Sequence, residues 1–115
     1  MSDAGNREQY PYHRRFVRHR VRLKVHVHSG QHFTAWTANV SEDGLSFEIP
    51  AFLPSGDEVD VWVYVSRAKK EEPPVETTCR IVWADRGKKG TRHGAQFTSF
   101  AADGKERLAA WLVHA

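Results

Sequence analysis

The stretch Arg20-Val21-Arg22-Leu23-Lys24-Val25-His26-Val27-His28 decides the fold class of this chain. Valine or leucine occupies every second position, and basic side chains occupy the positions between them. Because successive side chains of a β-strand point to opposite faces, the pattern predicts a strand with one buried and one solvated face. The next residues, Ser29-Gly30-Gln31, predict a short turn. Residues 33–40 are then expected to return as an antiparallel strand.

The same alternation recurs further along the chain and predicts four more strands. They are expected at residues 45–49, 59–65, 75–84 and 91–100. In the fourth strand, Trp62 and Tyr64 lie opposite the valines, and we expect them to form a second layer of core; an exposed partner surface is the alternative. In the fifth strand, we expect Trp83 on the same side as Ile81 and Cys79, with Cys79 in the core.

The period changes near the C-terminus. Leu108, Trp111 and Leu112 fall at i, i+3 and i+4, which predicts a short amphipathic helix with Asp103 as its N-cap. Six short antiparallel strands followed by one helix predict an all-β fold, a six-stranded antiparallel β-barrel whose helix covers an open end. Side chains fill a barrel of this size, so a ligand is expected on its outside or rim.

Length and composition indicate one domain that folds in a reducing compartment. The chain has 115 residues and a net charge of +3. We expect a flexible leader over residues 1–12 and a single domain over residues 13–115. No apolar run reaches the roughly 18 residues of a membrane span, so no membrane insertion is expected. The lone cysteine and the absence of a signal-like N-terminus favour the cytoplasm.

A basic cluster near the N-terminus indicates an anionic partner. Arg14, Arg15 and Arg18 lie close together there. Guanidinium groups match phosphate oxygens with a fixed fork of donors and also stack on nucleobases. A basic arm that serves only solubility is the alternative interpretation.

A second cluster of polar residues follows the second predicted strand. Asn39 and Ser41 are two positions apart, so in an extended chain they point to the same side and offer donors and acceptors to a base edge. Gly44 permits either a positive φ or a close approach by a ligand. The same residue types also form ordinary turns, which remains the alternative.

Metal binding and catalysis have little support in the sequence. His26, His28 and His32 are close enough for a metal site to be conceivable, but a fourth ligand is not evident. We interpret them as exposed strand histidines and expect no metal. No nucleophile and base stand out as a pair, so no enzymatic activity is expected.

The two polar clusters together resemble the signature of the PilZ domain family. That signature is Arg-x-x-x-Arg followed by Asp/Asn-x-Ser-x-x-Gly, here Arg14 to Arg18 and Asn39 to Gly44. The resemblance covers residues 12–114 approximately and includes the tryptophan that ends the fifth strand. Arg18 and Arg22 also fit the first motif. We prefer Arg14 and Arg18, because Arg22 falls within the strand alternation.

The resemblance implies a receptor for cyclic di-GMP. By similarity, Arg14 and Arg18 would hold the phosphates and contact guanine, and Arg15 would add a phosphate contact. Further contacts to guanine would come from Asn39, Ser41 and Gly44. The arginine arm would become ordered on binding, and an unidentified downstream protein would read the new surface. Motility, exopolysaccharide production and virulence are the processes that such receptors control.

Two other functions remain open. One is a PilZ-like protein-interaction module that does not bind nucleotide. The other is a basic β-barrel that binds RNA or single-stranded DNA, which requires aromatic residues between basic ones on one face. The first predicted strand, residues 20–28, contains no aromatic residue. We therefore expect no nucleic-acid partner.

Overall fold

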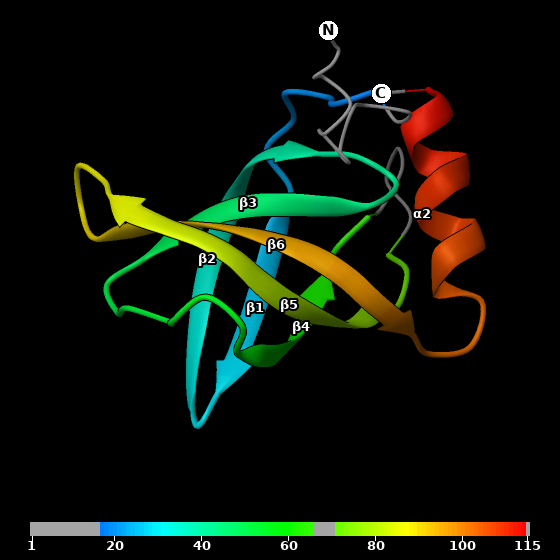
Figure 1. Ribbon diagram of the computed structural model, residues 1–115. Helices are drawn as coiled ribbons and strands as arrows, with labels where there is room; N and C mark the ends of the chain where they lie inside the picture. Colours follow the sequence, from blue (N-terminus) through cyan, green and yellow to red (C-terminus); the bar gives the residue numbers. More distant parts are fainter. Residues whose placement is uncertain (1–16, 66–70, 115) are drawn as a thin grey trace, which may run out of the picture.

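The computed structural model describes residues 17–65 and 71–114. The predicted leader and the side chains of Arg14 and Arg15 lie outside the described residues. The elements are β1 (Lys24–Ser29), β2 (Gln31–Val40), β3 (Gly44–Ile49), β4 (Glu58–Val63), β5 (Val75–Arg86), β6 (Thr91–Phe100) and α2 (Gly104–Val113). The strands form a closed barrel in the order β1-β2-β3-β6-β5-β4 (Figure 1). This confirms the predicted six-stranded antiparallel barrel with a C-terminal helix.

Closure of the barrel depends on β1, which pairs with β2 on one side and with β4 on the other. Val25 faces Ala35 across the first pairing and Val63 across the second. On the opposite side of the barrel, β6 lies between β3 and β5. All of these pairings are antiparallel. Because the barrel is closed, each of the six strands has a neighbour on both sides and none is left as an open edge.

The core consists of the inward-facing residues of the strands and one side of the helix. Val25, Val27 and the β4 valines are almost fully buried, and Cys79 is buried among them as predicted. Leu108 and Leu112 of α2 join the same apolar cluster. Figure 1 shows α2 beside the barrel, near the point where β6 ends. Asp103 is at the N-cap, although its side chain makes no capping hydrogen bond.

Strand β1 is shorter at its start than the alternation predicts, because a side chain replaces part of the backbone ladder there; the Thr37 N–H still donates to the Leu23 carbonyl at 2.9 Å. The Thr37 hydroxyl accepts a hydrogen bond from the Leu23 backbone N–H at 2.8 Å and donates one to the Val21 carbonyl at 2.6 Å. Residues 20–23 therefore run along β2 without forming a regular ladder.

Helix α2 is too short and too polar to cross a membrane.

The placement of Trp83 in the core was wrong. The register between β5 and β6 shifts between Ile81 and Trp83, where β5 contains a bulge. An extra residue reverses the alternation, so Val82 and Trp83 both face outward, and Trp83 is 45% exposed.

The expected second core layer over β4 was also wrong. Trp62 and Tyr64 are half-buried on the outer face of the barrel. Trp62 lies beside His28 and Tyr64 lies beside His26, with ring centroids 4.9 Å apart in each pair. The barrel wall is a single sheet, and its outer face takes the aromatic residues that alternate with the valines.

Candidate functional site

One described residue of each polar cluster, Arg18 and Asn39, meets the other at the end of β2. His19 forms an antiparallel bridge with Val40: the His19 N–H donates to the Val40 carbonyl at 2.8 Å, and the Val40 N–H donates to the His19 carbonyl at 2.9 Å. This bridge holds the chain so that the Arg18 Nη1 donates to the Asn39 Oδ1 at 2.9 Å across 21 positions of sequence. The guanidinium has five N–H donors, and the Asn39 contact uses one of them. Two residues that the signature assigns to one site, Arg18 and Asn39, are therefore in direct contact.

The turn after β2 is built around Ser41. Its side chain is fully buried, and its backbone N–H donates to the Gly44 carbonyl at 2.9 Å. The Ser41 hydroxyl hydrogen-bonds the Asp43 carboxylate, and the Asp43 N–H donates back to that hydroxyl at 3.2 Å. The Asp43 carbonyl accepts from the Phe97 N–H at 2.9 Å, which joins the turn to β6. Ser41 therefore shapes the turn from inside, and it does not stand beside Asn39 on the surface as expected.

Position 44 requires glycine because another group approaches its backbone closely, which is one of the two reasons that the sequence suggested. The approaching group is the backbone of β6, whereas the sequence suggested a ligand. A Cβ on Gly44 would lie 2.2 Å from the Ala95 carbonyl oxygen of β6. Positive φ is found at Gly30 and Gly56 among the described glycines and does not explain Gly44. The signature glycine thus allows β3 to pack against β6.

The alternative motif register places Arg22 elsewhere. The Arg22 guanidinium carbon lies 5.0 Å from the centroid of the Trp36 ring, a cation–π distance. Arg22 therefore lies just before β1 against Trp36 on the outer face of β2, whereas Arg18 contacts Asn39. This arrangement favours Arg18 as the second arginine of the motif; its proposed partner Arg14 lies outside the described residues.

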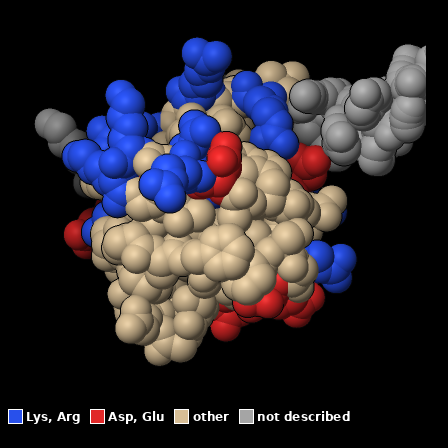
Figure 2. All heavy atoms as spheres, turned by 60° about the vertical axis from the view of Figure 1, so that its left-hand side comes forward, with Lys and Arg blue, Asp and Glu red and all other residues tan. Residues whose placement is uncertain are grey.

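A second basic group, which the sequence reasoning treated only as a loop, lies at the β5–β6 hairpin. Arg86, Lys88, Lys89 and Arg92 are all exposed there. In Figure 2 the left-hand side of Figure 1, where the hairpin lies, is turned forward. Lys and Arg side chains gather over the upper part of that face. Arg92 is paired with Asp85 at 3.8 Å, and the other cations of the group attract anions over distances of about a Debye length. The run Arg86-Gly87-Lys88-Lys89 was the feature of the sequence that could have indicated this basic group.

The histidines form a ring cluster on the outer face of the barrel. His32 lies 4.9 Å from His26 and 4.3 Å from His28, measured between ring centroids. Within the described residues, no group of three or more His, Cys, Asp or Glu side chains is arranged to hold a metal ion. Burial, followed by the neighbouring His32 and Lys24, lowers the pKa of His26 and so favours its neutral form.

These features define a small barrel with an arginine held at a polar turn, and the chain belongs to the PilZ domain family. The family model matches residues 12–114. Two solved structures share the fold at 14% sequence identity. One is the Bacillus subtilis inhibitor of motility MotI/DgrA, with a TM-score of 0.78 over 88% of this chain and 50% of that chain. The other is the PilZ domain of YcgR from Escherichia coli with c-di-GMP, with a TM-score of 0.63 over 89% of each chain.

This chain therefore spans only half the length of MotI. No curated protein matches the sequence.

Proposed function

We propose that this chain is a receptor for cyclic di-GMP that acts on a protein partner and has no enzymatic activity. The observation that carries the proposal is the 2.9 Å contact from Arg18 to Asn39, which joins the two halves of the PilZ signature. The YcgR PilZ domain, which shares this fold, was solved with c-di-GMP. MotI, which also shares the fold, is an inhibitor of motility, and this makes motility the first process to examine.

The chemistry of the ligand matches the groups at the end of β2. Cyclic di-GMP carries two phosphodiester charges and two guanines, so it needs forked cations, flat stacking partners and an amide that reads a base edge. Arg18 supplies the fork and Asn39 the amide. The His19–Val40 bridge fixes Arg18 before the ligand arrives, which lowers the ordering entropy lost on binding.

The remaining signature residues are assigned as follows. Arg14 and Arg15, which lie outside the described residues, would fold onto the barrel with the ligand and add phosphate contacts. Ordering of that arm lowers the net affinity and creates a new surface for a partner to recognise. Ser41 and Gly44 are buried, so they would act on the guanine site indirectly, by shaping the turn beside Asn39. The Cys79 thiol is buried and its pKa is raised to about 12, so it is no nucleophile.

Isothermal titration calorimetry with cyclic di-GMP tests the proposal, with GTP as the control ligand. We expect saturable binding of the dinucleotide alone, with a molar ratio that separates one bound ligand from a pair. Arg18→Ala should weaken binding about 10- to 100-fold, because a charge-assisted contact is lost. Arg80→Ala is the matched control, since Arg80 is an exposed arginine paired with Glu58 on another part of the barrel.

Two results would contradict the proposal. A flat trace from a folded wild-type sample would favour the PilZ-like interaction module that does not bind nucleotide. Equal losses in the Arg18 and Arg80 variants would show that only the general positive charge attracts the ligand.

A further inference from the structure

A row of cations at the start of β1 and just before it lies between aromatic residues of the two neighbouring strands. Arg20 and Arg22 precede β1 and are exposed, and Lys24 begins the strand and is half-buried. Across the pairing with β2, Lys24 is opposite Trp36. On the β4 side, the Tyr64 N–H donates to the Lys24 carbonyl at 3.0 Å, which places Tyr64 next to Lys24. We call this surface the cation–aromatic face.

Two cations already rest on aromatic rings of this face. The Arg22 guanidinium carbon is 5.0 Å from the Trp36 centroid, and the Lys24 Nζ is 5.0 Å from the Tyr64 centroid. Both distances are within the range of a cation–π contact. Trp36 is 49% exposed despite its contact with Arg22. The face thus offers a large flat indole surface with fixed positive charge beside it.

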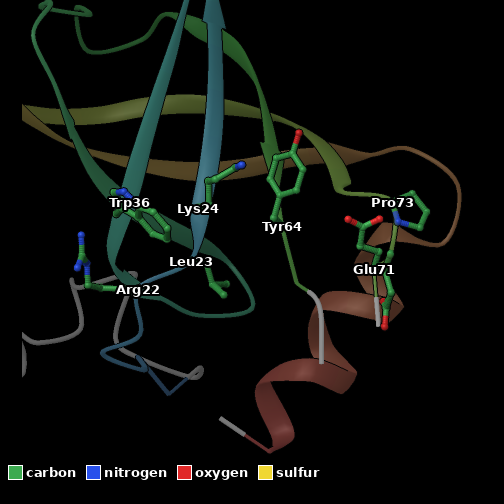
Figure 3. A pocket seen from close by; sticks show the side chains of 8 residues that line it. Arg22, Leu23, Lys24, Trp36, Tyr64, Glu71 and Pro73 are labelled. Atoms are coloured by element: carbon green, nitrogen blue, oxygen red, sulfur yellow. The ribbon is translucent and has the colours of Figure 1, made fainter. Parts of the chain in front are cut away.

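A depression of about 690 Å³ lies over these residues. Figure 3 shows Trp36 and Tyr64 on either side of Lys24, with Arg22 beside Trp36. The far wall of the depression consists of residues 71–73. A space of this size accommodates groups as large as nucleotides.

The charges and spacing fit a flexible strand that carries both phosphates and bases. Alternate residues of an extended strand are about 7 Å apart, comparable to the spacing of successive phosphates in a stretched single strand. Glu71 and Glu72 stand at the far wall, and Glu72 is paired with Arg107 at 3.3 Å. Among the described residues, Arg22 and Lys24 therefore line the depression together with one acidic group, Glu71, that is not paired with Arg107. The exposed Arg20 precedes Arg22 by two positions.

We propose that the cation–aromatic face binds single-stranded nucleic acid. Arg20, Arg22 and Lys24 contact the backbone phosphates, and bases stack on Trp36 and Tyr64. Stacking on aromatic side chains beside a cationic groove is how proteins bind single strands with little sequence preference. The sequence predicts no nucleic-acid partner, because the first predicted strand, residues 20–28, contains no aromatic residue. Closure of the barrel supplies the aromatic residues from β2 and β4.

Fluorescence anisotropy with a labelled oligothymidylate of about 15 nucleotides tests this proposal; an oligouridylate and a duplex of equal length serve as comparisons. At about 50 mM salt we expect saturable binding of a single strand, and weaker binding of the duplex. The ratio of the two single strands tells RNA from DNA. For three neutralised phosphates, the logarithm of the affinity should fall with the logarithm of salt with a slope of about −2.

Variants locate the binding surface. Trp36→Ala should weaken binding about tenfold, whereas Trp36→Phe should retain most of it. Trp83→Ala is the matched control, because Trp83 is 45% exposed on another strand. The double change Arg22→Gln and Lys24→Gln should lower the salt slope by more than one. Circular dichroism checks that each variant is folded.

The proposal is overturned if the wild type binds no single strand at low salt, if the duplex binds as tightly, or if Trp83→Ala weakens binding as much as Trp36→Ala. The face is distinct from the Arg18–Asn39 contact, so the two proposals can fail separately. Asn39→Ala should weaken cyclic di-GMP binding and leave oligonucleotide affinity within about twofold, since it changes no charge.

Discussion

The Cα of Gly44 lies directly against the backbone of Ala95, so that a Cβ at position 44 would be 2.2 Å from the Ala95 carbonyl oxygen and 3.3 Å from the Gln96 Cα. The two strands are paired at this point, with Gly44 opposite Gln96. The obstructing atoms belong to the backbone of a central strand and cannot swing aside. Gly44 therefore fixes how closely the turn that begins at Ser41, directly after β2, approaches β6.

Gly44→Ala should lower the free energy of unfolding by about 2–3 kcal/mol, because β3 and β6 must separate to admit the methyl group. Urea denaturation measures the change. Gly30→Ala is the control: Gly30 has φ +85 but no atom within 4 Å of its Cβ position, so only the backbone conformation opposes the change, at about 1 kcal/mol. A Gly44→Ala protein as stable as the wild type would show that the strands can adjust.

Thr37→Val should both destabilise the fold and weaken the ligand site. Thr37 is buried, and its hydroxyl bonds the backbone of Val21 and of Leu23. Valine leaves a buried N–H and a carbonyl without this partner, which destabilises by about 1–3 kcal/mol. It also loosens the segment that holds Arg18 beside Asn39, so cyclic di-GMP affinity should fall. Urea denaturation and calorimetry measure the two effects.

Thr78→Val is the matched control for this change. The Thr78 hydroxyl donates to the exposed Asp60 at 3.0 Å. Water replaces an exposed contact of this kind, so stability should change by less than about 0.5 kcal/mol and ligand affinity should stay the same. If Thr37→Val leaves cyclic di-GMP affinity unchanged, the segment before β1 does not position Arg18 for binding.

The sequence predicted the barrel because each strand carries its own alternation. Val25 and Val27 indicate an inward face without reference to any partner strand, and the change of period at Leu108 indicates the helix in the same way. Trp83 was misplaced because its bulge depends on the register with β6. Alternation also could not say whether another layer covers the outward side of Trp62.

The candidate site was predicted from a motif. The spacing of Arg18 and Asn39 matched a known paired signature that assigned both to one ligand site, and the structure places the two side chains in contact. The burial of Ser41 did not follow from the motif, because it depends on a four-residue turn that turns the hydroxyl inward. Likewise the aromatic neighbours of Lys24 come from two other strands, and their arrangement required the closed sheet.

Cys79 should not react with a thiol reagent in the native protein. Its side chain is fully buried, and burial raises the pKa of the thiol to about 12. Because the thiolate is the reactive form, labelling at about pH 8 should be negligible until the barrel opens. Reaction with a chromogenic disulfide measures this, with a sample in denaturing urea as the positive control. Rapid labelling of the native protein would mean that β5 opens readily.

His93 should make the fold less stable in mild acid. Its ring is fully buried, and its Nε2 accepts a hydrogen bond from the Leu53 N–H at 3.0 Å, which requires a neutral ring. Burial lowers the pKa of His93 below its ordinary value of 6.5. Between the folded and unfolded pKa values the unfolded chain binds more protons, so this contribution is complete above about pH 6.5 and is lost as pH falls through the folded pKa.

We therefore expect a lower free energy of unfolding at about pH 5 than at about pH 7.5, by up to about 1.4 kcal/mol for each pH unit between the two pKa values of His93. His93→Gln should reduce this dependence, since the Gln oxygen can accept from the Leu53 N–H without binding a proton. His114→Gln is the control, because His114 is an exposed histidine at the end of α2. Urea denaturation of the three proteins at both pH values measures the difference. An unchanged pH dependence in His93→Gln would assign the acid sensitivity to other groups.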